Sequence, residues 1–200
     1  MTEKRPFKVG LFGILAIVGA FLIFIWLLTF NDPALLNDLV TVSFFIIGGM
    51  VLGFLLGGVR FDALRGVDFI MTILSTVLNV VMYFYINQLV PMSIPFAVVN
   101  PQLFGVLVAV AEECFFRVGL CAMIDNLTGQ GWLAIIGSSA VWSTYHVAKY
   151  GGSTGILFMV FLCGCILGAT FIYTKSADGS IFGHGLVNYI VLAGKNAVVG

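Results

Sequence analysis

Residues Leu103–Ile124 read LFGVLVAVAEECFFRVGLCAMI. A helix of about 20 apolar residues crosses the hydrocarbon core of a bilayer, and this stretch has that length. It nevertheless contains three charged residues, Glu112, Glu113 and Arg117. Each such charge costs about 2.5–3.5 kcal/mol at the centre of a membrane helix, so we expect a chain that places three of them there to use them. The stretch therefore predicts a membrane helix that carries a functional site.

The composition of the whole chain is typical of a membrane protein. Of the 200 residues, 60% are hydrophobic and 9% are charged, whereas about 25% of the residues of a soluble domain are charged. Nine basic residues balance nine acidic ones, which argues against nucleic acid or another strongly charged partner. The four cysteines lie in apolar segments without the spacing of a zinc site, and we interpret them as buried apolar side chains.

Six further apolar runs flank this stretch, and each is continuous rather than alternating. Continuous runs favour helices over a membrane barrel. We therefore predict an all-α, polytopic transmembrane helix bundle of about seven transmembrane helices, with residues 1–200 forming a single integral membrane domain. The predicted spans are Val9–Phe30, Leu39–Val59, Val67–Val90, Leu103–Ile124, Trp132–Ala148, Ile156–Thr174 and Ile181–Val199.

The distribution of basic residues between the predicted spans indicates the orientation of the chain. Short loops on the cytoplasmic side are enriched in Lys and Arg. With the N-terminus in the cytoplasm and Arg117 within the fourth predicted span, only Lys149 and Lys195 fall outside and the other six basic residues fall inside. We expect this orientation in the cell (plasma) membrane. The residues placed inside are Lys4, Arg5, Lys8, Arg60, Arg65 and Lys175.

Helical spacing separates the roles of the three buried charges. Glu113 and Arg117 are four residues apart, so they lie on one helix face and can pair. Glu112 lies about 100° around the helix from Glu113, and its five-residue separation from Arg117 is poor geometry for pairing. Arg117 is therefore expected to neutralise Glu113, which leaves Glu112 as the candidate general base. Alternatively, the Glu113–Arg117 pair only fixes helix packing.

The chain contains two histidines, and each lies near the end of a predicted span. His146 lies in AVWSTYHVAKY and His184 lies in IFGHGLVNYI. Asn188 follows His184 by four residues and shares its helix face. An imidazole N–H and an amide N–H that converge on one oxygen can form an oxyanion hole. Taken singly, each of these residues could equally form an interfacial or interhelical hydrogen bond.

These polar residues resemble the three motifs of the CPBP family in their order and spacing. This family comprises the intramembrane CAAX proteases and bacteriocin-processing enzymes, including the type II CAAX prenyl endopeptidases, with the pattern EExxxR, FxxxH and HxxxN. The resemblance covers residues 103–199 as a CPBP-like catalytic core, whereas residues 9–90 carry no family signal. Trp142 stands where the family usually has Phe and keeps an aromatic side chain. The matching motifs are Glu112-Glu113-x-x-x-Arg117, Trp142-x-x-x-His146 and His184-x-x-x-Asn188.

The resemblance implies an intramembrane endopeptidase whose substrate is a peptide or a membrane protein in the lipid bilayer. Two histidines and a glutamate could also bind zinc, but the chain has no HExxH motif. We therefore expect a glutamate-type peptidase without metal or other cofactor. In that scheme Glu112 and His146 activate a water, Glu113 and Arg117 support the site, and His184 and Asn188 stabilise the tetrahedral oxyanion.

Two other classes of function remain open. The chain could be a non-catalytic CPBP-fold scaffold subunit of a membrane complex, or a carrier whose Glu and His residues relay protons or ions. Substitution of Glu112 by Gln separates these alternatives, because it abolishes proteolysis while leaving a scaffold intact.

The predicted topology places the two histidines at different depths. His146 ends the fifth span and His184 begins the seventh, and both spans run in the same direction. At 1.5 Å per residue the two imidazoles would lie about 10 Å apart along the membrane normal. We therefore predict that one of these segments is tilted, broken or begins deep in the bundle. The expected places are Gly137-Ser138-Ser139 and the glycines around His184, and imidazoles more than about 12 Å apart would contradict the catalytic interpretation.

Overall fold

The computed structural model describes most of the chain. The start and end of the third predicted span, the end of the seventh and the basic residues Lys4, Arg5 and Arg65 lie outside the described residues. The described ranges are 6–30, 32–62, 69–89, 101–150 and 152–196.

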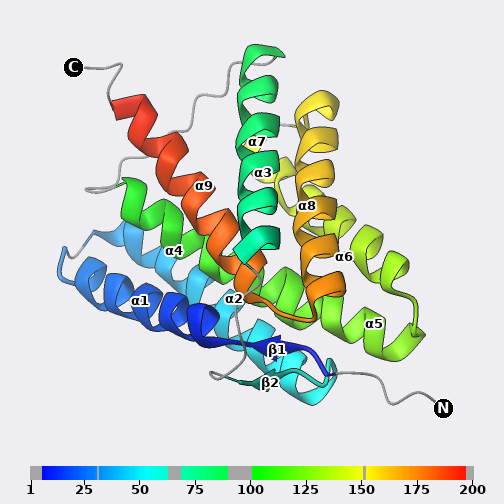
Figure 1. The fold of residues 1–200 in the computed structure, drawn as a ribbon. Helices are drawn as coiled ribbons and strands as arrows, with labels where there is room; N and C mark the ends of the chain where they lie inside the picture. Colours follow the sequence, from blue (N-terminus) through cyan, green and yellow to red (C-terminus); the bar gives the residue numbers. More distant parts are fainter. Residues whose placement is uncertain (1–5, 31, 63–68, 90–100, 151, 197–200) are drawn as a thin grey trace.

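Helices form nearly all of this part of the chain (Figure 1). They follow the long apolar runs, because a helix satisfies its backbone hydrogen bonds internally. Two strands of two residues each, β1 (Lys8–Val9) and β2 (Arg60–Phe61), were not predicted. The helices are α1 (Leu11–Leu28), α2 (Pro33–Leu55), α3 (Phe69–Leu89), α4 (Pro101–Glu113), the π-helix η1 (Cys114–Cys121), α5 (Ala122–Thr128), α6 (Gly131–Tyr145), α7 (Val147–Tyr150), α8 (Thr154–Thr174) and α9 (Asp178–Asn196).

The predicted polytopic helical membrane fold is confirmed. Three stretches within the described residues are long and apolar enough to cross a bilayer, namely Leu11–Leu28, Leu35–Leu55 and Thr154–Thr174. The shorter helical stretch Ile73–Met82 is also apolar. Large apolar side chains cover the exposed faces of these helices, as lipid contact requires. The number of seven spans stays a prediction.

α4, η1 and α5 follow one another without a break and form one long helical element through the bundle (Figure 1). The middle of this element packs directly on the backbone of α2. A Cβ atom on Gly49 would lie 2.2 Å from the carbonyl oxygen of Cys114, and one on Gly53 would lie 2.5 Å from that of Val118. Small residues thus allow the two backbones to touch, as they do in many membrane helix pairs.

A short parallel strand pairing joins the beginning of the chain to two distant segments. Lys8 pairs with Arg60 of β2 and also bridges to Ser176, just before α9. The carboxylate oxygen Oδ1 of Asp178 accepts hydrogen bonds from the backbone N–H groups of Gly10 and Gly13, at 2.8 and 3.0 Å. Asp178, the first residue of α9, therefore caps the N-terminus of α1.

The arrangement of α6 and α9 explains how the two histidines come to lie near each other. Figure 1 shows α4, α6 and α9 inclined to α3 and α8, which stand side by side. The helix predicted over Trp132–Ala148 is broken at His146, where α6 has ended and α7 has not begun. The prediction of a tilted or broken segment is confirmed, but its expected places were wrong. Both α6 and α9 run continuously through their glycines.

Candidate active site

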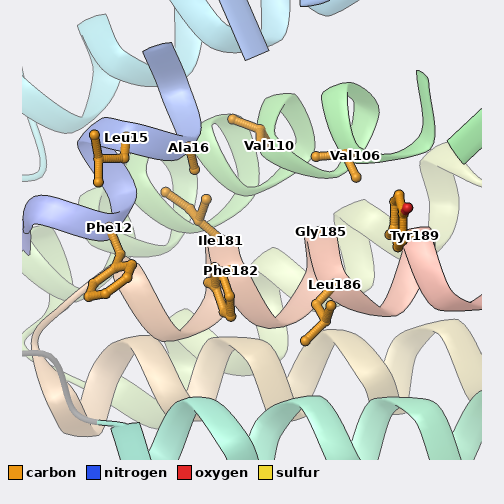
Figure 2. Close-up of a pocket in the computed structure, with 10 residues that line it drawn as sticks. All are labelled: Phe12, Leu15, Ala16, Val106, Val110, Ile181, Phe182, Gly185, Leu186 and Tyr189. Atoms are coloured by element: carbon orange, nitrogen blue, oxygen red, sulfur yellow. The ribbon is translucent and has the colours of Figure 1, made fainter. Parts of the chain in front are cut away.

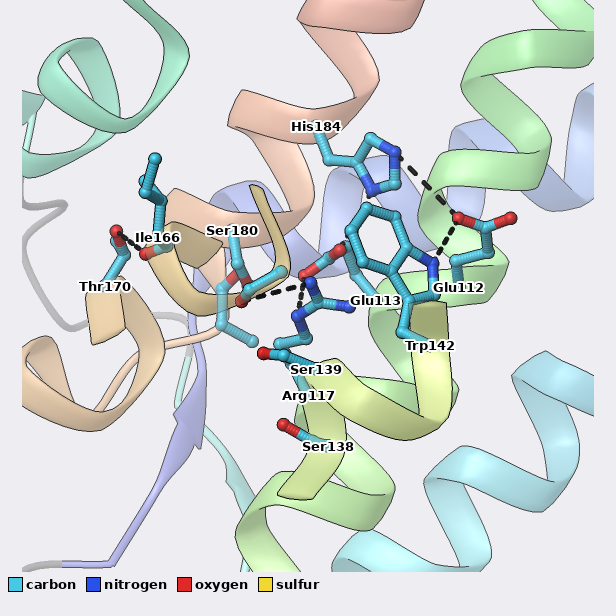
Figure 3. A network of polar contacts seen from close by, with 12 residues as sticks. Glu112, Glu113, Arg117, Ser138, Ser139, Trp142, Ile166, Thr170, Ser180 and His184 are labelled. Atoms are coloured by element: carbon cyan, nitrogen blue, oxygen red, sulfur yellow. Dashed lines mark hydrogen bonds and ion pairs between the residues drawn. The ribbon is translucent and has the colours of Figure 1, made fainter. Parts of the chain in front are cut away.

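Three helices bring polar side chains to the carboxyl group of Glu112, near the end of α4. The indole Nε1–H of Trp142, on α6, donates a hydrogen bond to Glu112 Oε2 at 2.8 Å. Nε2 of His146 lies 3.9 Å from Glu112 Oε1, and Nε2 of His184, on α9, lies 3.9 Å from Glu112 Oε2. Figure 3 shows Glu112, Trp142 and His184 facing one another. Both imidazoles thus lie near one carboxyl group. They are therefore closer together than the separation of about 12 Å that would contradict the catalytic interpretation.

Glu113 forms a second, fully buried cluster beside the first. Nδ1 of His184 lies 2.9 Å from Glu113 Oε1. Nε of Arg117 lies 3.3 Å from Glu113 Oε2, in an i,i+4 ion pair whose two side chains are both 0% exposed. The four-residue spacing predicted this pair. The geometry of the Arg117 Nε contact does not meet hydrogen-bond criteria, so the attraction is mainly between charges.

Further contacts hold the guanidinium of Arg117 in place. Nη2 of Arg117 donates to the carbonyl oxygen of Gly164 on α8, at 3.4 Å, and the guanidinium carbon lies 4.6 Å from the centre of the Trp142 ring. A Cβ atom on Gly164 would lie 2.9 Å from Trp142 Cε3, so this close approach of α8 requires a glycine. Arg117 thereby connects the Glu113 cluster to α6 and α8 through an ion pair, a hydrogen bond and a cation–π contact.

The hydrogen-bond partners of the two imidazoles fix which ring nitrogen faces Glu112. Nδ1 of His146 lies 2.9 Å from the carbonyl oxygen of Trp142, which can only accept, so this Nδ1 carries a hydrogen. Nδ1 of His184 faces the Glu113 carboxylate and, by the same argument, donates to it. Both rings therefore present Nε2 to Glu112. An imidazole whose Nδ1–H is engaged in this way is the usual arrangement for a positioned acid or base.

Asn188 lies apart from these two clusters. Its Nδ2 donates to the carbonyl oxygen of Gly105 on α4, at 3.0 Å. Gly105 precedes Glu112 by seven residues, which is about 10 Å along a helix. This hydrogen bond ties α9 to α4 away from the carboxyl group of Glu112. The structure therefore brings together Glu112, Glu113, Arg117, His146 and His184, and gives the Asn188 amide a packing contact.

A cavity of about 240 Å³ opens beside Glu112 between α2, α4 and the end of α6. The α4 residues that face it follow helical spacing from Phe104 through Val108 to Glu112. Asp38, at the N-terminal part of α2, is exposed and also lines it. We call this cavity the Asp38 cleft. Its described lining residues are Asp38, Thr41, Val42, Phe45, Phe104, Val108, Ala111, Glu112, Tyr145 and Ala148.

A second cavity, of about 400 Å³, lies on the opposite side of α4 and is almost wholly apolar (Figure 2). Val106 and Val110 of α4 line it, together with residues of α1 and α9. Gly185 lines it too, so it borders the helix segment that carries His184 without including the imidazole. Glu112, the candidate general base, lines the Asp38 cleft but not the second cavity.

Sequence reasoning missed two features of this site. Trp142 was expected to supply only an aromatic wall, whereas its N–H binds the candidate base. The π-helix after Glu113, which carries Arg117, was also not predicted, although such helices often occur at functional sites. Gly49 and Gly53 of α2 pack directly on the backbone of this π-helix. Within the described residues, no three His, Cys, Asp or Glu side chains are arranged as a metal site.

Comparisons with known proteins agree with the motifs. Residues 94–190 match the family model described as type II CAAX prenyl endopeptidase Rce1-like. No curated protein and no solved structure matches the chain. The matched range includes every motif residue from Glu112 to Asn188 and excludes α1, α2 and α3.

Proposed function

Because residues 94–190 belong to the Rce1-like family of type II CAAX prenyl endopeptidases, we propose that this integral membrane protein hydrolyses a peptide bond in or near the membrane with a water activated by Glu112 and His146. The observation that carries the proposal is the convergence of His146 Nε2 and His184 Nε2 on one carboxyl group, each at 3.9 Å. That distance is too long for a direct hydrogen bond and suits an intervening water or substrate atom.

In the first step, the water lies between Glu112 Oε1 and His146 Nε2. Trp142 engages Oε2 of the carboxyl group, so Oε1 is the oxygen on the His146 side. With a hydrogen on Nδ1, a neutral His146 offers the lone pair of Nε2 to one water hydrogen, and the carboxylate accepts the other. As the water oxygen bonds to the scissile carbonyl carbon, Glu112 takes a proton from it.

In the second step, the oxyanion needs a positive hydrogen-bond donor. His184 lies between two carboxylates, with Nδ1 on Glu113 and Nε2 towards Glu112. Because Glu112 carries the proton of the water at this stage, the negative charges are those of the oxyanion and Glu113. Arg117, together with a His184 that carries a hydrogen on both nitrogens, balances them. We propose that Nε2–H of His184 then donates to the oxyanion. Collapse of the tetrahedral species breaks the C–N bond, and Glu112 returns its proton to the leaving amine.

The experiment uses the purified chain in liposomes with a peptide library read by mass spectrometry. In water enriched in oxygen-18, the new carboxylate of each product should gain the label. His146→Ala should lose cleavage, and chelators should leave the wild-type rate unchanged. Loss of activity with a chelator and recovery with zinc would replace this mechanism with a metal-dependent one. Absence of cleavage by the wild-type chain from every library member would favour the scaffold function.

The positions of three basic residues support an N-terminus in the cytoplasm. Lys8 and Arg60 pair with each other in the strands, and Lys175 follows α8 beside the same segment. All three therefore gather at one end of the bundle (Figure 1). Since basic residues concentrate on the cytoplasmic side, we propose that this end faces the cytoplasm. Labelling of single cysteines introduced at Arg60 and Leu127 in intact cells tests it, because an N-out chain would expose both to an impermeant reagent.

A further inference from the structure

The Asp38 cleft combines two carboxylates with aromatic walls. Glu112 lies at its inner end, and Asp38 is exposed on α2 at its mouth. Phe45 and Tyr145 form its sides, with ring centroids 5.1 Å apart. None of the described lining residues is basic. Carboxylates and aromatic faces both attract cations, and they attract them more strongly where water is partly excluded.

The aromatic walls are held in position by further rings. Phe45 stacks on Phe115 with centroids 4.9 Å apart, and Phe116 lies 6.0 Å from Tyr145. Phe115 and Phe116 belong to η1, the element that also carries Arg117. Tyr145 directly precedes His146 in the chain. The walls of the cleft are therefore built on the same elements that position the proposed catalytic groups, so a side chain bound there would lie next to the reacting bond.

From this arrangement we propose that the Asp38 cleft binds a Lys or Arg side chain of the peptide substrate beside the scissile bond, with Asp38 as a specificity-determining residue. This inference rests on the proposed peptidase function, because the bound side chain belongs to a substrate. The aliphatic part of such a side chain packs against Phe45 and Tyr145, and its charged end reaches Asp38 at the exposed mouth. A long Lys or Arg side chain can keep its aliphatic part in apolar surroundings while its charge extends to the interface.

A binding experiment tests the inference independently of catalysis. Two fluorescent peptides differ only at one position, which is lysine in one and acetyl-lysine in the other. Their affinities for the full chain in an uncharged detergent are compared by fluorescence anisotropy at fixed salt. One partly exposed ion pair and one cation–π contact predict that the lysine peptide binds roughly three- to tenfold more tightly. Equal affinities for the wild-type chain would overturn the inference.

Three variants assign the preference to Asp38. Asp38→Asn should bring the affinity ratio close to one. The matched control is the double variant Asn37→Asp with Asp38→Asn, which keeps the net charge but moves it about 100° around the helix. It should behave like Asp38→Asn, whereas an unchanged preference would mean that only the overall charge matters and would overturn the inference. Asp38→Lys should make a glutamate peptide bind better than the lysine peptide.

Hydrolysis of the same peptides separates this inference from the proposed function. A wild-type chain that binds both peptides with equal affinity and cleaves both equally well would contradict the inference but would agree with the peptidase function. A chain that prefers lysine through Asp38 but cleaves neither these peptides nor any member of the library would contradict the peptidase function and support the cleft as a binding site for cationic side chains.

Discussion

His184 Nδ1 lies 2.9 Å from Glu113 Oε1, which links the seventh residue of α9 to the last residue of α4. The bond orients the imidazole so that Nε2 points towards Glu112. Glu113 thus stands behind His184 much as a carboxylate stands behind the histidine of a catalytic triad. Adjacent glutamates on one helix thereby make different contacts, because each projects from a different face.

Removal of either partner of the Glu113–Arg117 pair should destabilise the fold. Both side chains are fully buried, and a buried charge that loses its partner costs about 3–5 kcal/mol. We expect Glu113→Gln and Arg117→Met each to lower the unfolding temperature in detergent. The double variant should recover much of the stability without recovering proteolysis. Additive losses in the double variant would show that the two residues do not act as a pair.

Trp142→Phe isolates the contribution of one hydrogen bond. The change keeps an aromatic ring but removes the N–H that binds Glu112 Oε2. A hydrogen bond to a charged group contributes about 1.5–3 kcal/mol to stability, so we expect a lower unfolding temperature, and we expect a lower kcat because Glu112 loses the donor that orients its carboxyl group. Trp142→Ala is the contrasting variant, because it also removes the packing against Gly164 and Arg117 and should destabilise the chain further. Equal kcat for Trp142→Phe and wild type would show that this hydrogen bond is not used in catalysis.

Asn188→Ala distinguishes a packing role from a catalytic role. Loss of the hydrogen bond to Gly105 should cost about 1 kcal/mol of stability and leave kcat within about tenfold of wild type. An oxyanion-hole residue would behave differently, with kcat falling about 100- to 1,000-fold. Comparison of kcat with the unfolding temperature, with His184→Ala as the catalytic reference, decides between the two.

Asp178→Ala should weaken the start of α1 without touching the reacting groups. The carboxylate caps two backbone N–H groups, and loss of a cap costs about 0.5–2 kcal/mol. Gly10→Ala should be at least as harmful, because its Cβ would lie 2.4 Å from Asp178 Oδ2. Gly19→Ala, at a position with open space, is the matched control. Thermal unfolding of the three variants is the measurement, and equal unfolding temperatures would contradict the capping role.

The features that sequence predicts here are those that depend on neighbours along one helix. Apolar runs predict the helices, and the four-residue spacing predicts the Glu113–Arg117 pair. Three contacts join segments that are distant in the chain, so no local sequence pattern predicts them. They are the hydrogen bond from Trp142 to Glu112, the Asp178 cap on α1 and the strand pairing of Lys8. The break at His146 also lacks a local signal, since neither Gly nor Pro stands there. The place of Asn188 likewise depends on how α9 packs on α4.

The most direct test of the account is the rate of peptide hydrolysis by Glu112→Gln relative to wild type, both reconstituted at equal amounts in liposomes. Gln keeps the size of the side chain and can still accept from Trp142, but it cannot take a proton from water. If Glu112 is the general base, the wild-type chain should cleave the peptide, and the rate should fall by at least about 1,000-fold in the variant with an unchanged unfolding temperature. A variant that cleaves as fast as the wild-type chain would contradict this role.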